Sequence, residues 1–71
     1  MNIRQFHYQD FFFNLPPEGK KEFKEEAECM LEWAQSTFYY KIQGVRLKNY
    51  EIVSLNKLVL RYAARFKIRA I

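Results

Sequence analysis

Apolar residues recur with helical spacing over two long stretches of the chain. The first stripe comprises Phe23, Ala27, Met30, Leu31 and Ala34. Spacings of three, four and seven residues place side chains on one side of an α-helix, and the faces beside this stripe are rich in Lys and Glu. The pattern predicts a helix over residues 17–32, with Pro17 in its first turn and Glu18 near its positive end.

The second stripe comprises Ile52, Leu55, Leu58, Val59, Tyr62, Ala63 and Phe66. It predicts a helix over residues 49–66, in which Asn49 is the N-cap and Glu51 lies in the first turn. Another face of this helix carries a basic row of Lys57, Arg61 and Arg65. We interpret the row as a solvated face, unless it lies beside the middle helix, where it would suit a polyanion. Residues 67–71 fray or form a strand-like end.

A short helix is predicted between these two, over residues 35–43, with Gly44 in a position that suits the end of a helix. Phe38 and Ile42 are four residues apart and give it an apolar inner face. Its other positions can form hydrogen bonds: Gln35, Ser36, Thr37, Tyr39, Tyr40 and Lys41. Two helices joined by a short turn, the second short and basic, describe a helix-turn-helix.

Residues 1–15 follow no single period. Alternation is seen for Phe6, Tyr8 and Phe12, and helical spacing for Ile3, Phe6 and Phe13. Periodicity therefore leaves strand and helix open for this segment. Because the three consecutive residues Phe11–Phe13 cannot all point into one small core, we expect an aromatic arm packed on the domain, with a dimer contact as the alternative.

Length and composition fit one small all-α domain over residues 1–71, with three helices, or four if the arm is helical. The chain has 71 residues, of which 49% are apolar and 18% aromatic. Residues 1–34 carry four Lys or Arg against seven Asp or Glu, a balance of −3. Residues 35–71 carry eight against one, a balance of +7. A basic half beside an acidic half indicates a surface for a polyanion, although two solvated helices would give the same balance.

The segment S-T-F-Y-Y-K-I resembles the recognition helix of TetR-type repressors, over about ten residues. It also resembles small single-domain regulators of bacterial mobile elements, over residues 15–59. These resemblances imply double-stranded DNA as the partner, with the 35–43 helix in the major groove. Two positions depart from the usual pattern: Glu32 replaces the turn glycine, which would force a left-handed or wider turn, and Ala34 replaces the Ser or Thr cap.

The resemblance also implies a role for each polar residue of the site. Gln35, Ser36 and Tyr40 would face base edges, while Thr37, Tyr39 and Lys41 would lie near phosphates. Arg46 and Lys48, just beyond the helix, suit contacts with the DNA backbone. Since one copy would bind weakly, we expect a homodimer on two half-sites.

The sequence offers few residues suited to metal binding, disulfide formation or catalysis. One cysteine, Cys29, and one histidine, His7, cannot make a structural zinc site or an intrachain disulfide, and nothing in their spacing pairs them for catalysis. Cys29 is expected to be at least half-buried. We expect no enzymatic activity, cofactor or metal, and the lack of a signal peptide or apolar span predicts a cytoplasmic protein without membrane contact. The alternative function is a small protein-interaction module or an inhibitor from a mobile element, using the same scaffold.

Overall fold

The computed structural model describes residues 5–70, so that Ile3 and the last residue, Ile71, lie outside the described part. Its helices are α1 (Tyr8–Asn14), α2 (Pro17–Leu31), α3 (Gln35–Lys41) and α4 (Asn49–Phe66). No strand occurs among the described residues. The predicted all-α class is confirmed, and the architecture is the four-helix alternative because the N-terminal segment is itself helical.

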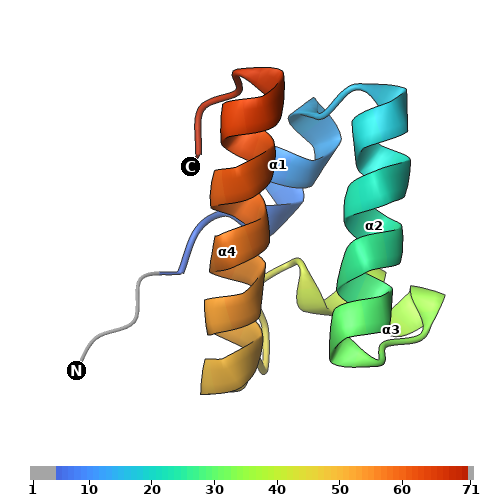
Figure 1. Cartoon of the computed structure of the whole chain (residues 1–71). Coiled ribbons are helices and arrows are strands. Elements are labelled where there is room, and N and C mark those ends of the chain that lie inside the picture. Colours follow the sequence, from blue (N-terminus) through green and yellow to red (C-terminus); the bar gives the residue numbers. More distant parts are fainter. Residues whose placement is uncertain (1–4, 71) are drawn as a thin grey trace.

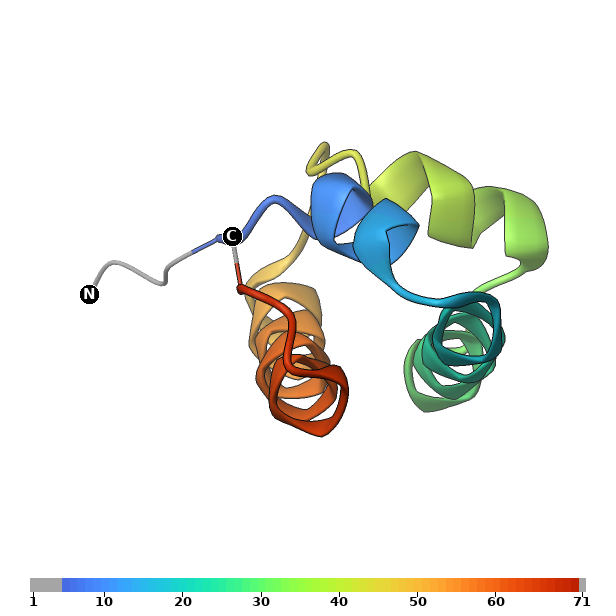
Figure 2. The same ribbon diagram turned by 90° about the horizontal axis from the view of Figure 1, so that it is seen from above.

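The four helices form two layers. In Figure 1, α2 and α4 lie side by side and run in opposite directions, with α1 behind their upper halves and α3 crossing below. The view from above in Figure 2 shows α1 and α3 together in a second layer behind this pair. The core lies between the layers, so each helix buries one face.

The aromatic segment at the start of the chain contributes directly to this core. Phe11 and Phe12 are buried, whereas the third phenylalanine, Phe13, is 54% exposed. Tyr8 is also buried, and its hydroxyl donates a hydrogen bond to Asn56 Oδ1 of α4 at 2.6 Å. Helix α1 therefore belongs to the body of the domain, and one turn of helix explains why three adjacent rings have different surroundings.

The predicted stripes of α2 and α4 form most of the remaining core. Phe23, Ala27 and Leu31 of α2 are buried, as are Ile52, Leu55, Leu58, Val59 and Tyr62 of α4. The prediction is wrong for Met30, which is 45% exposed, and for Ala34, which is exposed in extended backbone before α3. Met30 lies to one side of the line through Phe23, Ala27 and Leu31, which is the line that faces both α3 and α4.

Helix α2 ends in a left-handed turn at Glu32. This is one of the two alternatives, a left-handed or a wider turn, that we expected where Glu32 replaces the usual turn glycine. Glu32 has φ 56° and ψ 43°, and the Trp33 N–H donates to the Glu28 carbonyl at 3.0 Å. This bond spans five residues and closes the helix in the manner of a Schellman motif. The left-handed region is unfavourable for a residue with a Cβ atom, so the turn that leads into α3 is strained.

Replacing Glu32 with glycine should therefore stabilise the domain. We expect Glu32→Gly to raise the free energy of unfolding by about 1 kcal/mol, because glycine adopts this conformation without steric cost. Urea unfolding followed by circular dichroism measures the difference. The matched control is Glu25→Gly, an exposed position inside α2, where glycine should lower the free energy of unfolding by about 1 kcal/mol. A destabilised Glu32→Gly variant would contradict a strained turn.

Candidate nucleic-acid interface

Helix α3 is held by its inner face, which packs on both neighbouring helices. Phe38 and Ile42 are buried, as predicted. The ring centroid of Phe38 lies 5.2 Å from that of Phe12 in α1 and 6.3 Å from that of Phe23 in α2. Trp33, in the turn before α3, is half-buried, and its ring centroid is 6.4 Å from that of Phe38. The orientation of α3 is therefore fixed by aromatic contacts with two other helices.

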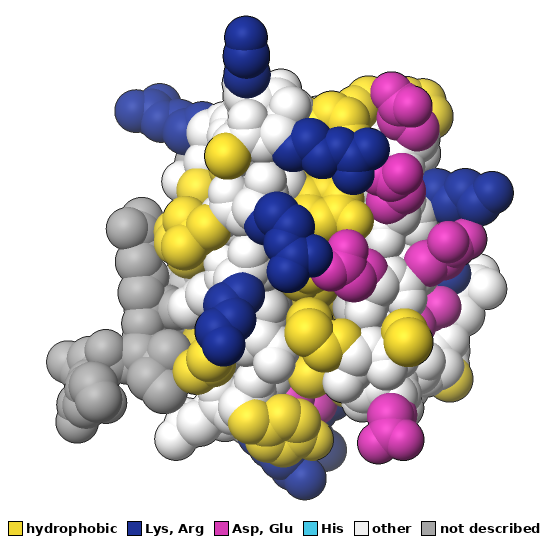
Figure 3. All heavy atoms as spheres, viewed as in Figure 1, with side chains coloured by type: hydrophobic (Ala, Val, Ile, Leu, Met, Phe, Trp, Pro, Cys, Tyr) yellow, Lys and Arg dark blue, Asp and Glu magenta, His cyan; other side chains and the backbone are white. Residues whose placement is uncertain are grey.

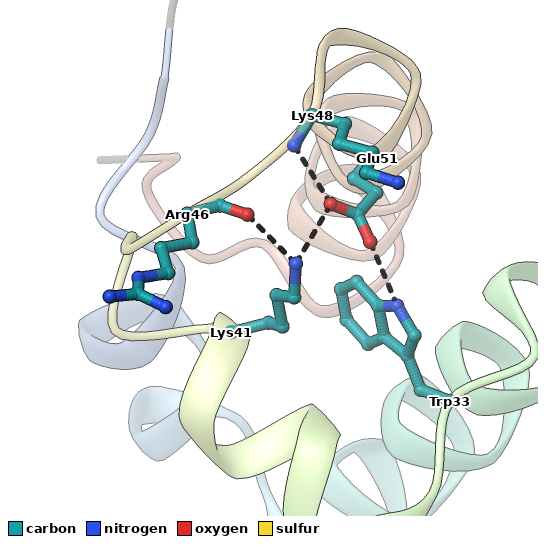
Figure 4. A network of polar contacts seen from close by, with 5 residues as sticks. All are labelled: Trp33, Lys41, Arg46, Lys48 and Glu51. Atoms are coloured by element: carbon teal, nitrogen blue, oxygen red, sulfur yellow. Dashed lines mark hydrogen bonds and ion pairs between the residues drawn. The ribbon is translucent and has the colours of Figure 1, made fainter.

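A single carboxylate fixes α3 at both ends. Glu51, in the first turn of α4, accepts hydrogen bonds from Trp33 Nε1 at 3.0 Å and from Lys41 Nζ at 3.2 Å (Figure 4). Trp33 precedes α3, and Lys41 is its last residue. The Lys41 ammonium also donates to the Arg46 carbonyl at 2.8 Å. Glu51, only 3% exposed, thus connects the two ends of α3 to the start of α4.

Burial alone would raise the pKa of the Glu51 carboxyl, but the pKa is lowered. The Lys48 backbone N–H donates to Glu51 Oε1 at 2.8 Å, and the bonds from Trp33 and Lys41 add to it. Together with the positive charge of Lys41, these hydrogen bonds stabilise the ionised form by more than burial disfavours it. The carboxylate therefore stays charged in the folded protein and keeps its partners.

The same bond corrects the predicted start of α4. Lys48, not Asn49, is the N-cap, and Asn49 is already helical. Lys48 has extended backbone, with φ −81° and ψ 159°, and its N–H is satisfied by Glu51 three residues later. This is one half of a capping box, in which the acidic residue accepts from the N-cap backbone. The sequence signal for Asn49 as a cap was misleading because the carboxylate supplies the bond instead.

The connection between α3 and α4 begins with a hydrogen-bonded turn that contains Gly44. Regular helix ends at Lys41, before the predicted boundary at Gln43, and a tight turn follows in which the Gly44 N–H donates to the Lys41 carbonyl at 2.9 Å. Gly44 has φ 90°, a conformation that favours glycine. Its carbonyl accepts a bond from Gln5 Nε2 at 3.0 Å, which joins the N-terminal segment to the end of the turn.

The outer face of α3 consists of exposed neutral side chains. Gln35 and Ser36 are exposed, Thr37 is half-buried, and Tyr39 and Tyr40 are 39% and 46% exposed. Tyr39 packs edge-on against Phe12 and Phe38, and the Lys24 ammonium lies 5.8 Å from its ring centroid. Tyr39 is therefore partly engaged by the domain, whereas Gln35, Ser36 and Tyr40 are presented outward.

The predicted cationic residues occupy two different environments. Arg46 and Lys48 are exposed in the segment that follows α3. The Lys41 side chain is only 17% exposed, and its ammonium is bonded to Glu51 and to the Arg46 carbonyl. A phosphate contact by Lys41 would have to replace these bonds. The structure thus brings Gln35, Ser36, Tyr39 and Tyr40 to the outside of α3, but turns Lys41 inward.

Two of the three residues in the basic row of α4 are paired with acids of α2. Arg61 forms an ion pair with Glu26, and Arg65 forms one with Glu22. On this side of the molecule, Lys and Arg gather along α4 and Asp and Glu along α2, with hydrophobic side chains between them (Figure 3). The opposite charges of the two halves therefore meet on one face, and Arg61 and Arg65 form no unopposed basic surface beside α3.

Tyr62 lies between these ion pairs. It is 3% exposed, and its hydroxyl donates to Glu26 Oε1 at 2.8 Å. Burial raises the pKa of the Tyr62 phenol to about 12, and the hydrogen bond to Glu26 acts in the same direction. Glu26 thus connects a core residue to a surface ion pair, which ties α2 and α4 together.

Sequence reasoning missed the central role of Glu51, which was predicted only as a charge near a helix N-terminus. A signal was present, because Glu51 is the only acid among residues 35–71 and lies in the first turn of a predicted helix, two residues after the candidate N-cap Asn49. It also missed the pairing of α2 with α4. Glu22 and Glu26 are four residues apart, as are Arg61 and Arg65, so that each pair lies on one face of its own helix and can face the other pair.

The described residues were searched for metal-binding groups and for membrane-spanning helices. No group of three His, Cys, Asp or Glu residues there could hold a metal ion. None of the helices formed by residues 5–70 is long and apolar enough to cross a membrane. Cys29 is exposed on α2, contrary to the expectation that it is at least half-buried. Comparisons with protein families, curated proteins and solved structures found no match.

Proposed function

We propose that this chain binds double-stranded DNA sequence-specifically and regulates transcription, with α3 in the major groove. The observation that carries the proposal is the construction of α3. Its outer face is made of exposed hydrogen-bonding side chains without an acid, and Glu51 fixes both of its ends. A helix that reads bases needs such a face on a rigid support.

Each residue of the interface then has a proposed role. Gln35 and Ser36 contact base edges, since the N-terminal part of a recognition helix lies deepest in the groove. Tyr40, exposed one turn beyond Ser36 on the same outer face, contacts a base edge as well. Thr37, Tyr39, Arg46 and Lys48 contact phosphates, which supply most of the affinity. Lys41 is a positioning residue in this proposal, because its ammonium is already bonded within the domain.

The proposal includes a homodimer, because α3 is short and has few residues to contact DNA. Two copies would bind half-sites about 34 Å apart, one turn of the double helix. The proposed function also includes the cytoplasmic location expected from the sequence, and it assigns the chain a role in binding and not in catalysis.

Selection from a library of randomised duplexes, followed by mobility shift, tests the proposal. We expect one sequence to be enriched and its affinity to fall steeply with salt. Lys48→Ala should weaken binding to all sequences about equally and reduce the salt dependence, because a phosphate contact carries no sequence information. The control is Lys57→Ala, an exposed lysine on α4 outside the proposed interface. Absence of any enriched sequence would refute sequence-specific DNA binding.

A protein-interaction module is the second candidate, and one observation favours it. The side of α4 away from the core exposes three large apolar residues, Tyr50, Val53 and Leu60, which are 57%, 40% and 56% exposed. Exposed apolar groups of this kind suit contact with another protein. Of the aromatic run Phe11–Phe13, for which the sequence allows a contact with a partner, Phe13 is exposed, whereas Phe11 and Phe12 are core residues and give no support. Stoichiometric capture of a protein that DNA does not displace would favour this candidate.

A further inference from the structure

We infer that α3 reads adenine–thymine pairs and not guanine, an inference that rests on the proposed function. Within Gln35–Lys41 the only positively charged residue is Lys41. Its ammonium lies 2.8 Å from the Arg46 carbonyl oxygen and 3.2 Å from Glu51 Oε1, on the inner side of the helix. The outward face of α3 therefore presents no cation to the bases.

The lack of a cation on the outward face of α3 determines which bases it can contact in the major groove. Guanine presents two acceptors, N7 and O6, which arginine or lysine binds best. Adenine presents one acceptor and one donor, and the side-chain amide of Gln35 supplies the matching donor and acceptor. Thymine presents a methyl group, for which the ring of Tyr40, 46% exposed, offers apolar surface. The exposed groups of α3 thus match adenine and thymine.

Cations near α3 in the described part of the chain are held at its margins. Lys24 of α2 is bonded to Glu28 Oε2 at 2.8 Å, and its ammonium lies over the Tyr39 ring. Arg46 and Lys48 follow the C-terminal end of α3, whereas Gln35 lies at its N-terminal end, the part of a recognition helix that lies closest to the bases. These cations are therefore suited to the DNA backbone and not to a guanine opposite Gln35.

The test compares the same substitution at the first residue of α3 and in the turn that follows this helix. The wild-type chain, Gln35→Arg and Gln43→Arg are each used to select from a randomised duplex library. Gln43 is exposed just beyond the C-terminal end of α3, so that it serves as the control for added charge. We expect the wild type to select adenine at one position of each half-site and Gln35→Arg to select guanine there. Gln43→Arg should bind more tightly but keep the wild-type preference.

The expected change in preference is about tenfold or more at that one base pair, the discrimination of a good bidentate contact. Circular dichroism confirms that each variant is folded before selection. Selection of guanine by the wild type at the position that Gln35→Arg alters, or adenine retained by Gln35→Arg, would overturn the inference while DNA binding stands. If none of the three proteins enriches any sequence, the proposed function fails and the inference fails with it.

Discussion

Glu51→Ala is expected to lower the free energy of unfolding by about 3 kcal/mol, the effect of breaking a buried ion pair. Without the carboxylate, the Trp33 indole N–H loses its acceptor and the Lys41 ammonium keeps only the Arg46 carbonyl. Urea unfolding of the variant and the wild type at neutral pH gives the difference. The control is Glu25→Ala, an exposed acid of α2, which should change stability by less than about 0.5 kcal/mol.

The pH dependence of this loss of stability separates the contribution of the negative charge of Glu51 from that of its side-chain packing. Hydrogen bonds lower the pKa of Glu51 from its ordinary value of 4.5, despite its burial. A depressed pKa means that the stabilisation is complete above the ordinary value and is lost as the pH falls through the folded-state value. Glu51→Gln has the shape of the protonated acid, so its deficit should be largest at neutral pH and shrink in acid. A deficit that does not change with pH would contradict this account.

The role of Glu51 also explains why α3 is so well defined despite its length. An isolated helix of seven residues is unstable in water, so tertiary contacts must supply its stability. Phe38 and Ile42 supply the apolar part, and the bonds from Trp33 and Lys41 to Glu51 fix the ends. The group that orients α3 is thus in another helix, where its substitution would disturb α3 without removing any residue of its outer face.

The sequence predicted the long helices well and the short ones less well, for physical reasons. Residues such as Phe23, Ala27, Leu55 and Val59 repeat over several turns, so their period is unambiguous. Helix α1 is only seven residues long, and the run Phe11–Phe13 places apolar residues on every side of it. Periodicity cannot identify so short a helix, and only its packing against the other helices decides which rings are buried.

The candidate site was predictable in its exposed part and not in its buried part. The four-residue spacing of Phe38 and Ile42, with polar residues at the other positions, was sufficient to predict which side of α3 faces outward. The inward position of Lys41 depends on Glu51, ten residues away across a loop with two residues of positive φ, Gly44 and Arg46. The path of such a loop is set by positive-φ backbone conformations that leave no periodic signal in the sequence.

Phe12→Ala is expected to be the most disruptive substitution considered, with a loss of about 4 kcal/mol in the free energy of unfolding. Phe12 is 3% exposed, and its ring contacts those of Phe23 in α2 and Phe38 in α3. A domain of this size has a total stability on the order of 5 kcal/mol, so a cavity at this point would leave much of the protein unfolded at room temperature. Thermal unfolding followed by circular dichroism measures the effect.

The neighbouring residue supplies the control for Phe12→Ala, because the same side chain is removed one position further along the same helix. Phe13 is 54% exposed and contacts the edge of Phe12 and the Lys20 ammonium. Phe13→Ala should therefore cost less than about 1 kcal/mol. Equal losses for the two variants would show that Phe13 is buried in solution, as by a second copy of the chain. A loss confined to Phe12 would instead establish that α1 is an integral part of the core, on which α3 depends for its position.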